Sequence, residues 1–230
     1  MLNQLQPSKK HGIKHAFTMI ELVMVIVVLG ILAAMALPRL ERDVRQEAGD
    51  NILSAIRYTQ HLALMDNKAN INVTPKVNWQ RALWQMRFVN YGNEWQYIIA
   101  SDTSYAGNLA QNESAIDTAT GKYMHTTDAI INSDESPEIF LSKKYGVNSV
   151  DFTNCTGKIG SGQADNAATH IAFDYLGRPH KGLGGATDNM STLMHADCTI
   201  TFTFEDGSQD LKILIRKDTG YANIVDQNAS

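Results

Sequence analysis

A long apolar run near the N-terminus constrains this chain more than any other feature. Residues 17–37 are almost wholly apolar, and residues 1–16 are mostly polar, with three lysines and no acid. About 20 apolar residues are enough for a helix to cross a bilayer. A basic stretch followed by an apolar run is also the outline of an export signal. The run therefore predicts a membrane-spanning helix or a cleaved signal peptide.

Two cleavage sites are compatible with this arrangement. An ordinary signal peptide has an apolar core of about 7–15 residues and is cut after it. Such a cut after Ala36 would release a soluble protein that starts at Leu37. The other cut, between Ala16 and Phe17, would keep the apolar helix. We favour the second site, because the run is too long for an ordinary signal core.

One carboxylate, Glu21, lies inside the apolar run. An ionisable side chain in lipid costs on the order of 3 kcal/mol on insertion scales, so its presence indicates a function. Cleavage before Phe17 would create an α-amino group one turn away, and a carboxylate paired with a neighbouring subunit's amine is less unfavourable than a lone one. We therefore predict that Glu21 promotes side-by-side assembly and fixes its register. The alternative is a protonated or snorkelling carboxylate without a partner.

The same residues resemble a known family, the type IV prepilins and type II secretion pseudopilins. The resemblance implies that 1–16 is a leader peptide, that a prepilin peptidase cuts between Ala16 and Phe17, and that Phe17 is then N-methylated. Glu21 becomes the fifth mature residue, as in the family. Ala16 departs from the family pattern, in which glycine is usual. The residues that carry the resemblance are Phe17-Thr18-Met19-Ile20-Glu21-Leu22, Gly30-Ile31-Leu32-Ala33-Ala34 and Pro38.

The resemblance implies a non-enzymatic structural subunit, a minor pilin or pseudopilin, that needs no cofactor. It would assemble into a type IV pilus-like or type II secretion pseudopilus filament. Its partners would be other pilin subunits, the prepilin peptidase, an inner-membrane assembly platform and membrane lipid. The lysines before the apolar run predict a periplasmic C-terminal domain on a single-pass inner-membrane anchor. In an assembled pilus that domain would be extracellular.

Three alternatives to this function stay open. Within the family, the chain could serve adhesion or DNA uptake. In a different class, it would be a secreted soluble binding protein or hydrolase cut after Ala36.

The segments 171–179, 199–215 and 219–221 are also similar to the minor pseudopilin H or FimT-like branch of the family.

Helical periodicity continues beyond the apolar run. Segment 38–66 is expected to be an amphipathic continuation of the helix. Its apolar residues recur at three- and four-residue steps, as in a helix with one buried face. Pro38 cannot donate a backbone hydrogen bond, so we predict a kink there. The residues of the apolar stripe are Leu40, Val44, Ala48, Ile52, Ala55, Ile56, Leu62 and Met65.

Residues 67–230 read as a β-rich globular domain. Thr199–Phe204 alternates strictly between polar and apolar, and Asp206-Gly207 is a turn that returns the chain into a second strand. Segment 101–137 has little periodicity and many turn formers, so we expect a long loop region. Together these patterns predict an α+β fold with a long N-terminal helix on an antiparallel sheet. The other expected strands cover 79–89, 94–100, 138–142, 147–152 and 171–175.

Two cysteines, Cys155 and Cys198, lie in the part expected to be exported. An even count outside the cytoplasm predicts a disulfide. The alternative is a metal site made by Cys198 and His195 with His170 or His180, but these residues lack the paired spacing of zinc sites. We therefore predict no bound metal.

Charge and motifs exclude further classes. The formal net charge is −4, and loss of the three leader lysines makes it −7. No basic stripe is visible, so no nucleic acid is predicted as a partner. Neither a nucleophile elbow, a Walker loop nor a zincin motif occurs. Four acids could hold a calcium ion, but they match no ordered calcium loop, so we favour solvated loop residues: Asp188, Asp197, Asp206 and Asp210.

Overall fold

The computed structural model describes residues 18–68, 79–155, 169–183 and 192–225. Within these ranges, only the backbone is described for 34–43 and Asn154. The chain divides into two compact units, Met1–Arg42 and Asp43–Ser230. Each unit is described by itself below.

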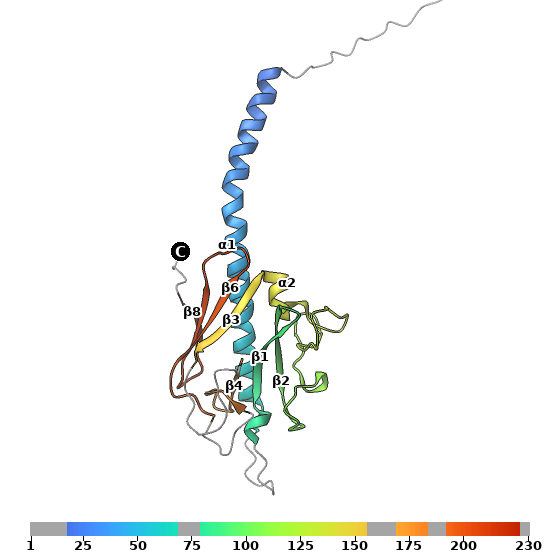
Figure 1. Cartoon of the computed structure of the whole chain (residues 1–230), viewed down its shortest axis with the longest axis vertical. Coiled ribbons are helices and arrows are strands. Elements are labelled where there is room, and N and C mark those ends of the chain that lie inside the picture. Colours follow the sequence, from blue (N-terminus) through green and yellow to red (C-terminus); the bar gives the residue numbers. More distant parts are fainter. Residues whose placement is uncertain (1–17, 69–78, 156–168, 184–191, 226–230) are drawn as a thin grey trace, which may run out of the picture. The chain divides into compact units, whose positions relative to one another are not determined.

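Helix α1 (Met19–Met65) occupies the N-terminal third of the described chain (Figure 1). This one helix includes most of the apolar run and nearly all of the amphipathic segment that was expected to continue it. The helical backbone continues through Pro38. The kink expected there stays a prediction. The domain boundaries expected from the sequence also stay predictions.

The second unit contains two four-stranded sheets in which every strand pair is antiparallel. This confirms the predicted α+β fold, a helix combined with an antiparallel β-sheet domain. The first sheet consists, in spatial order, of β2 (Glu94–Ser101), β1 (Trp84–Tyr91), β4 (His170–Phe173) and β5 (Pro179–His180). The second consists of β3 (Val147–Asn154), β6 (Cys198–Phe204), β7 (Leu211–Ile215) and β8 (Ala222–Val225).

Two hairpins agree with their sequence signals. Strands β1 and β2 pair from Trp84 opposite Ser101 to Tyr91 opposite Glu94. The two residues between the strands both have positive φ, as a two-residue hairpin turn requires. In β6, the cysteine and the aromatic and aliphatic side chains are buried while the threonines between them are partly exposed, so the predicted alternation is confirmed.

The last five turns of α1 and both sheets share one core. Phe88 of β1 connects the sheets, because its ring centroid lies 5.6 Å from those of both Phe152 in β3 and Phe202 in β6. Figure 1 shows β3, β6 and β1 arranged along this part of α1. The residues of α1 that enter the core are Ala48, Ile52, Ala55, Ile56 and Ala63.

One expected strand is wrong. Segment 138–142 forms a 3-10 turn, η3 (Pro137–Ile139), followed by the short helix α2 (Leu141–Tyr145). Its apolar residues are buried one after another, so they produce neither a strand period nor a helix period. The loop predicted over 101–137 is confirmed, since the only helix or strand between the end of β2 and the start of η3 is the 3-10 turn η2 (Gln111–Glu113). The expected 79–89 strand begins only at Trp84, after the 3-10 turn η1 (Trp79–Ala82).

Candidate assembly site at the start of the first helix

Thr18 and Glu21 form a reciprocal cap at the start of α1. The backbone N–H and the hydroxyl of Thr18 both donate to Oε2 of Glu21, at 2.9 Å each. The backbone N–H of Glu21 donates to Oγ1 of Thr18 at 3.3 Å. This is a capping box, which satisfies N–H groups that a helix start leaves without partners. The cap holds the Glu21 carboxylate beside the positive end of the helix dipole.

The sequence reasoning included Thr18 only as part of the family resemblance. Its spacing to Glu21 is itself a signal, since a threonine followed three residues later by a glutamate marks a helix N-terminus. The same carboxylate that was predicted to act between subunits therefore also has a role within its own chain.

Every described side chain from Thr18 to Ala33 is exposed. Gly30 is equally open, because a Cβ added there would meet no atom within 4 Å. A helix that is apolar on all sides normally buries that surface against other molecules or other elements. The large exposed apolar residues of this segment are Met19, Ile20, Leu22, Val23, Met24, Val25, Ile26, Val27, Val28, Leu29, Ile31 and Leu32.

Two parts of the predicted site cannot be placed. Ala16 and Phe17 lie outside the described residues, so the cleavage and the N-methylation stay predictions.

Among the helices of the described residues, none combines the length and the apolar character that a membrane crossing requires.

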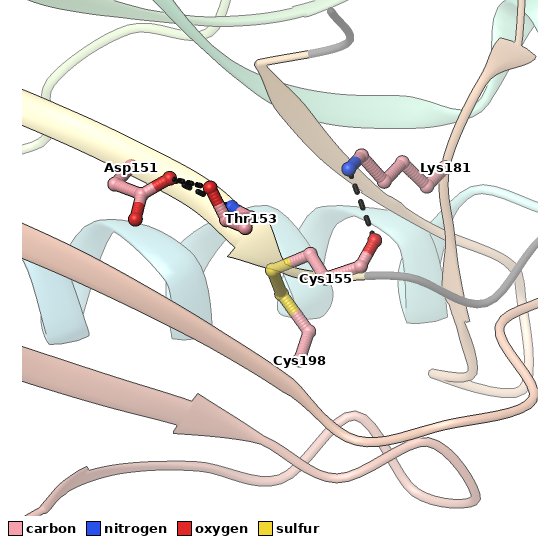
Figure 2. Close-up of a disulfide and its surroundings, with 5 residues drawn as sticks. All are labelled: Asp151, Thr153, Cys155, Lys181 and Cys198. Atoms are coloured by element: carbon pink, nitrogen blue, oxygen red, sulfur yellow. Dashed lines mark hydrogen bonds between the residues drawn. A yellow bond between two sulfur atoms is a disulfide. The ribbon is translucent and has the colours of Figure 1, made fainter. Parts of the chain in front are cut away.

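The predicted disulfide is present between Cys155 and Cys198 (Figure 2). It joins the end of β3 to the start of β6, and both cysteines are buried. Lys181 lies on the other side of Cys155 and donates from Nζ to its carbonyl oxygen at 3.0 Å. The alternative of a metal site is wrong for Cys198, because its sulfur is bonded to Cys155. The described residues contain no group of three or more potential metal ligands.

A buried set of hydrogen-bonded polar side chains lies around β5. Nε2 of His180 is 3.3 Å from Oδ2 of Asp174, and Nδ1 is 2.9 Å from the Thr192 hydroxyl. Arg178 donates from Nε to the same Oδ2 at 2.8 Å. Burial alone would raise the pKa of Asp174, but hydrogen bonds from His180 and Arg178 lower it to about 2. The carboxylate therefore stays ionised at neutral pH.

The order hydroxyl, imidazole, carboxylate also occurs in nucleophilic catalysts. Here the hydroxyl of Thr192 is closed off, since the residue is only 1% exposed. The backbone N–H groups of Leu176 and Arg178 instead donate to Oδ1 of Asp174 and fix the turn between β4 and β5. We therefore assign this group to the stability of the fold.

Comparison with known families identifies the N-terminal segment. Residues 13–37 match the family model described as the prokaryotic N-terminal methylation motif. The chain carries this methylation motif. The motif is typical of type IV prepilins and pseudopilins, so the predicted resemblance is confirmed at that level. The H or FimT-like branch stays a prediction. No curated protein and no solved structure matches the chain.

The methylation motif coincides with the candidate assembly site. It spans the expected cleavage position, the cap formed by Thr18 and Glu21, and the exposed segment up to Ala33. The motif thus supports a pilin-like subunit, a class of structural proteins, and it assigns no catalytic residue.

Proposed function

We propose that this protein is a membrane-anchored structural subunit, a minor pilin or pseudopilin, that assembles into a type IV pilus-like or type II secretion pseudopilus filament. The observation that carries the proposal is the methylation motif at 13–37 on a helix whose described side chains are exposed and mostly apolar up to Ala33. Apolar surface of this extent is stable only when lipid or other subunits cover it.

Maturation begins with cleavage between Ala16 and Phe17 by a prepilin peptidase, followed by N-methylation of Phe17. The methylated amine keeps its positive charge. It then pairs with Glu21 of an adjacent subunit, which removes the cost of an unpaired carboxylate in an apolar environment. The partners in this process are other pilin subunits, the peptidase, an inner-membrane assembly platform and lipid.

The cap of Thr18 and Glu21 bears on this pairing. A carboxylate has about four acceptor positions, and in Glu21 the hydrogen bonds from Thr18 both go to Oε2. Among the described residues, Oε1 accepts no hydrogen bond. The cap therefore orients the carboxylate while leaving acceptor capacity for an amine from outside the chain.

Replacement of Glu21 tests the assembly step. Glu21→Gln should leave the protein in the membrane fraction and reduce its amount in sheared filaments at least about tenfold, because the amide cannot neutralise an amine. Glu47→Gln is the matched control, since Glu47 is an exposed carboxylate on the same helix. Filaments that contain the Glu21→Gln protein at the wild-type level would refute the role of this carboxylate.

The N-terminus of the mature protein separates the proposal from the soluble alternative. Intact-mass and N-terminal sequencing should show a chain that begins at Phe17 and carries one additional methyl group. A chain that begins at Leu37 would identify a secreted soluble protein cut after Ala36, and it would overturn the proposed function.

A further inference from the structure

A small polar pocket lies in the second unit, between α1 and the segment that follows β2. Asn51 and Tyr58 of α1 line it, together with Tyr97 of β2, Asp117 of the loop region and Glu138 of η3. Its volume is about 180 Å³. Sites for cofactors and metabolites usually measure roughly 300–1,000 Å³. This pocket therefore fits a single amino-acid side chain better than a free small molecule.

The walls of the pocket are held in place by hydrogen bonds. The Tyr97 hydroxyl donates to Oδ1 of Asn51 at 3.3 Å, and Nδ2 of Asn51 donates to Oε2 of Glu138 at 3.2 Å. The Tyr58 hydroxyl donates to the carbonyl oxygen of Ile116 at 2.9 Å. Since these contacts all lie within the chain itself, a ligand would not have to supply them, and ordering is a main cost of binding.

The charge of Asp117 is the feature that points to a ligand. Asp117 is only 9% exposed, yet no cation of the described residues pairs with it. Glu138, in contrast, pairs with Lys144. Buried charges in proteins are usually paired. The pocket thus retains one negative charge that no cation among the described residues neutralises.

Hydrogen bonds keep this carboxylate ionised. Burial alone would raise the pKa of Asp117, but donation from the Ser136 and Thr120 hydroxyls and from the Ala119 backbone holds it below its ordinary value. The hydroxyls donate at 2.7 Å each. Asp117 therefore carries its charge at neutral pH although it is nearly buried.

The rest of the lining suits a long cationic side chain. Met124 and Ala55 provide apolar surface for a methylene stem. Tyr58 and Tyr97 also line the pocket, and aromatic rings attract lysine and arginine. Burial raises the pKa of both tyrosines, and the nearby carboxylates raise it further, so the lining sits in a negative potential.

We propose that this pocket binds the side chain of a lysine or arginine presented by a neighbouring filament subunit. The inference rests on the proposed function, because it takes the donor of that side chain to be another pilin-like subunit. A purely structural role of Asp117 accounts for its hydrogen bonds within the 117–121 turn. It does not account for a nearly buried charge that lines a pocket and has no cation partner among the described residues.

A titration of the detergent-solubilised full chain tests the proposal without assembly. The probes are N-acetyl-lysine methylamide and its uncharged isostere N-acetyl-norleucine methylamide, followed by NMR shifts of the amides around the pocket. We expect saturable shifts with the lysine probe that weaken as salt is added. The norleucine probe should cause none. Equal responses to both probes, or no saturable response to either, would overturn the proposal.

Two variants locate the binding. Asp117→Asn should weaken binding of the lysine probe about tenfold, since a partly buried ion pair is lost. Asp210→Asn removes the same charge from an exposed position outside the pocket and should leave affinity unchanged. Ser54→Lys, at an exposed position on the pocket lining, should fill the pocket from within and abolish binding without touching the loop. Retained binding in both Asp117→Asn and Ser54→Lys would refute the assignment.

These outcomes are independent of the filament experiment. A monomer in detergent can bind the lysine probe even if Glu21→Gln assembles normally, and it can fail to bind even if the protein is a pilin. Failure of the pocket and failure of the proposed function are therefore distinguishable.

Discussion

At the scale of single residues, the second unit contains several buried polar groups whose surroundings decide their protonation. His170 of β4 is fully enclosed, and its Nε2 accepts hydrogen bonds from the backbone N–H groups of Gly182 and Leu183, at 3.1 and 3.4 Å. Burial lowers the pKa of His170 to about 3, and the charges of Arg87 and Lys181 act in the same direction. The ring is therefore neutral in the folded protein.

This histidine should make folding pH-dependent. In the unfolded chain its pKa is about 6.5, so below that pH the unfolded state binds the proton and the folded state does not. The free energy of unfolding should therefore fall as pH drops from about 6.5 toward 3. Between pH 7.5 and 5, the wild type should lose about 2 kcal/mol more than His170→Gln in urea unfolding. An equal pH dependence of both proteins would contradict the assignment.

Gly220 meets a different constraint, a close approach of the backbone. A Cβ at this position would lie 2.2 Å from the carbonyl oxygen of Gly177 and 2.9 Å from the ring of Phe173, and φ is +66°. Gly220→Ala should therefore destabilise the protein by about 3 kcal/mol or more in chemical denaturation. Gly207→Ala is the control, because its φ is +71° but its Cβ would meet no atom within 4 Å. It should lose only about 1–2 kcal/mol.

Comparable losses of unfolding free energy in Gly220→Ala and Gly207→Ala would show that backbone conformation alone determines the cost of these substitutions. The difference expected here comes from packing. Gln60 of α1 donates to the carbonyl oxygens of both Gly177 and Thr219, at 2.8 Å each. The two turns and the helix therefore meet where no side chain fits.

At the scale of elements, the disulfide fixes the central strand of the second sheet to its edge strand. Cys155 follows β3 and Cys198 begins β6, so the bridge closes a loop with a sequence separation of 43. The chain-entropy model gives about 4 kcal/mol for a loop of that length. The bridge lies where the ladder between the two strands is irregular, next to a register shift between Asp151 and Asn154.

Removal of this bridge should therefore be costly. The double replacement Cys155→Ser with Cys198→Ser should lower the free energy of unfolding by about 2–4 kcal/mol, measured with the wild type in oxidised form. Wild type treated with reductant should approach the variant. A thiol titration of the folded wild type should find no free sulfhydryl, and a result of two would refute the bridge in the exported protein.

The sequence predicted elements well where side chains alternate. The hairpin of β6 and β7 has threonines on one face and apolar side chains on the other, so period and turn agree. Segment 138–142 was missed because Ile139, Phe140 and Leu141 are all fully buried, and a continuous apolar run has no period. Local sequence could not show that β2, α1 and the core enclose this segment from several sides.

The candidate site was predictable to a different degree. Glu21 is visible because a carboxylate in an apolar run is unusual, and the cap with Thr18 had a readable spacing. The disulfide followed from an even cysteine count. The pocket around Asp117 and Tyr97 was not predictable, since its residues come from separate elements that only the folded chain brings together.

At the scale of the whole molecule, apolar surface is distributed unequally between the two units. The described side chains of the first unit from Thr18 to Ala33 are all exposed, whereas the second unit encloses a core of both sheets and the end of α1. The exposed segment must be covered by lipid, detergent or other subunits. We therefore expect the full chain to associate when detergent is removed.

A matched pair of substitutions tests this expectation. Ile26 and Ile130 are 58% and 65% exposed, but only Ile26 belongs to the continuous apolar segment of α1. Ile26→Asp should weaken self-association about a hundredfold, since an unpaired carboxylate in an apolar contact costs roughly 3 kcal/mol. Ile130→Asp should have little effect. Sedimentation velocity after detergent removal measures both, and an equal effect of the two would contradict the role of the apolar segment.

The borders of the two sheets have a consequence for how copies can join. The outer side of β2 is occupied by bridges from Gln96 to Phe140 and from Ala100 to Ser114, and the outer side of β5 by a bridge from His180 to Leu193. Of the other two border strands, β8 is short, and β3 pairs with β6 through two register shifts that make it irregular. Long unprotected strands are what allow proteins to polymerise by adding sheet to sheet. For the proposed filament we therefore expect growth through contacts between helices rather than by strand addition.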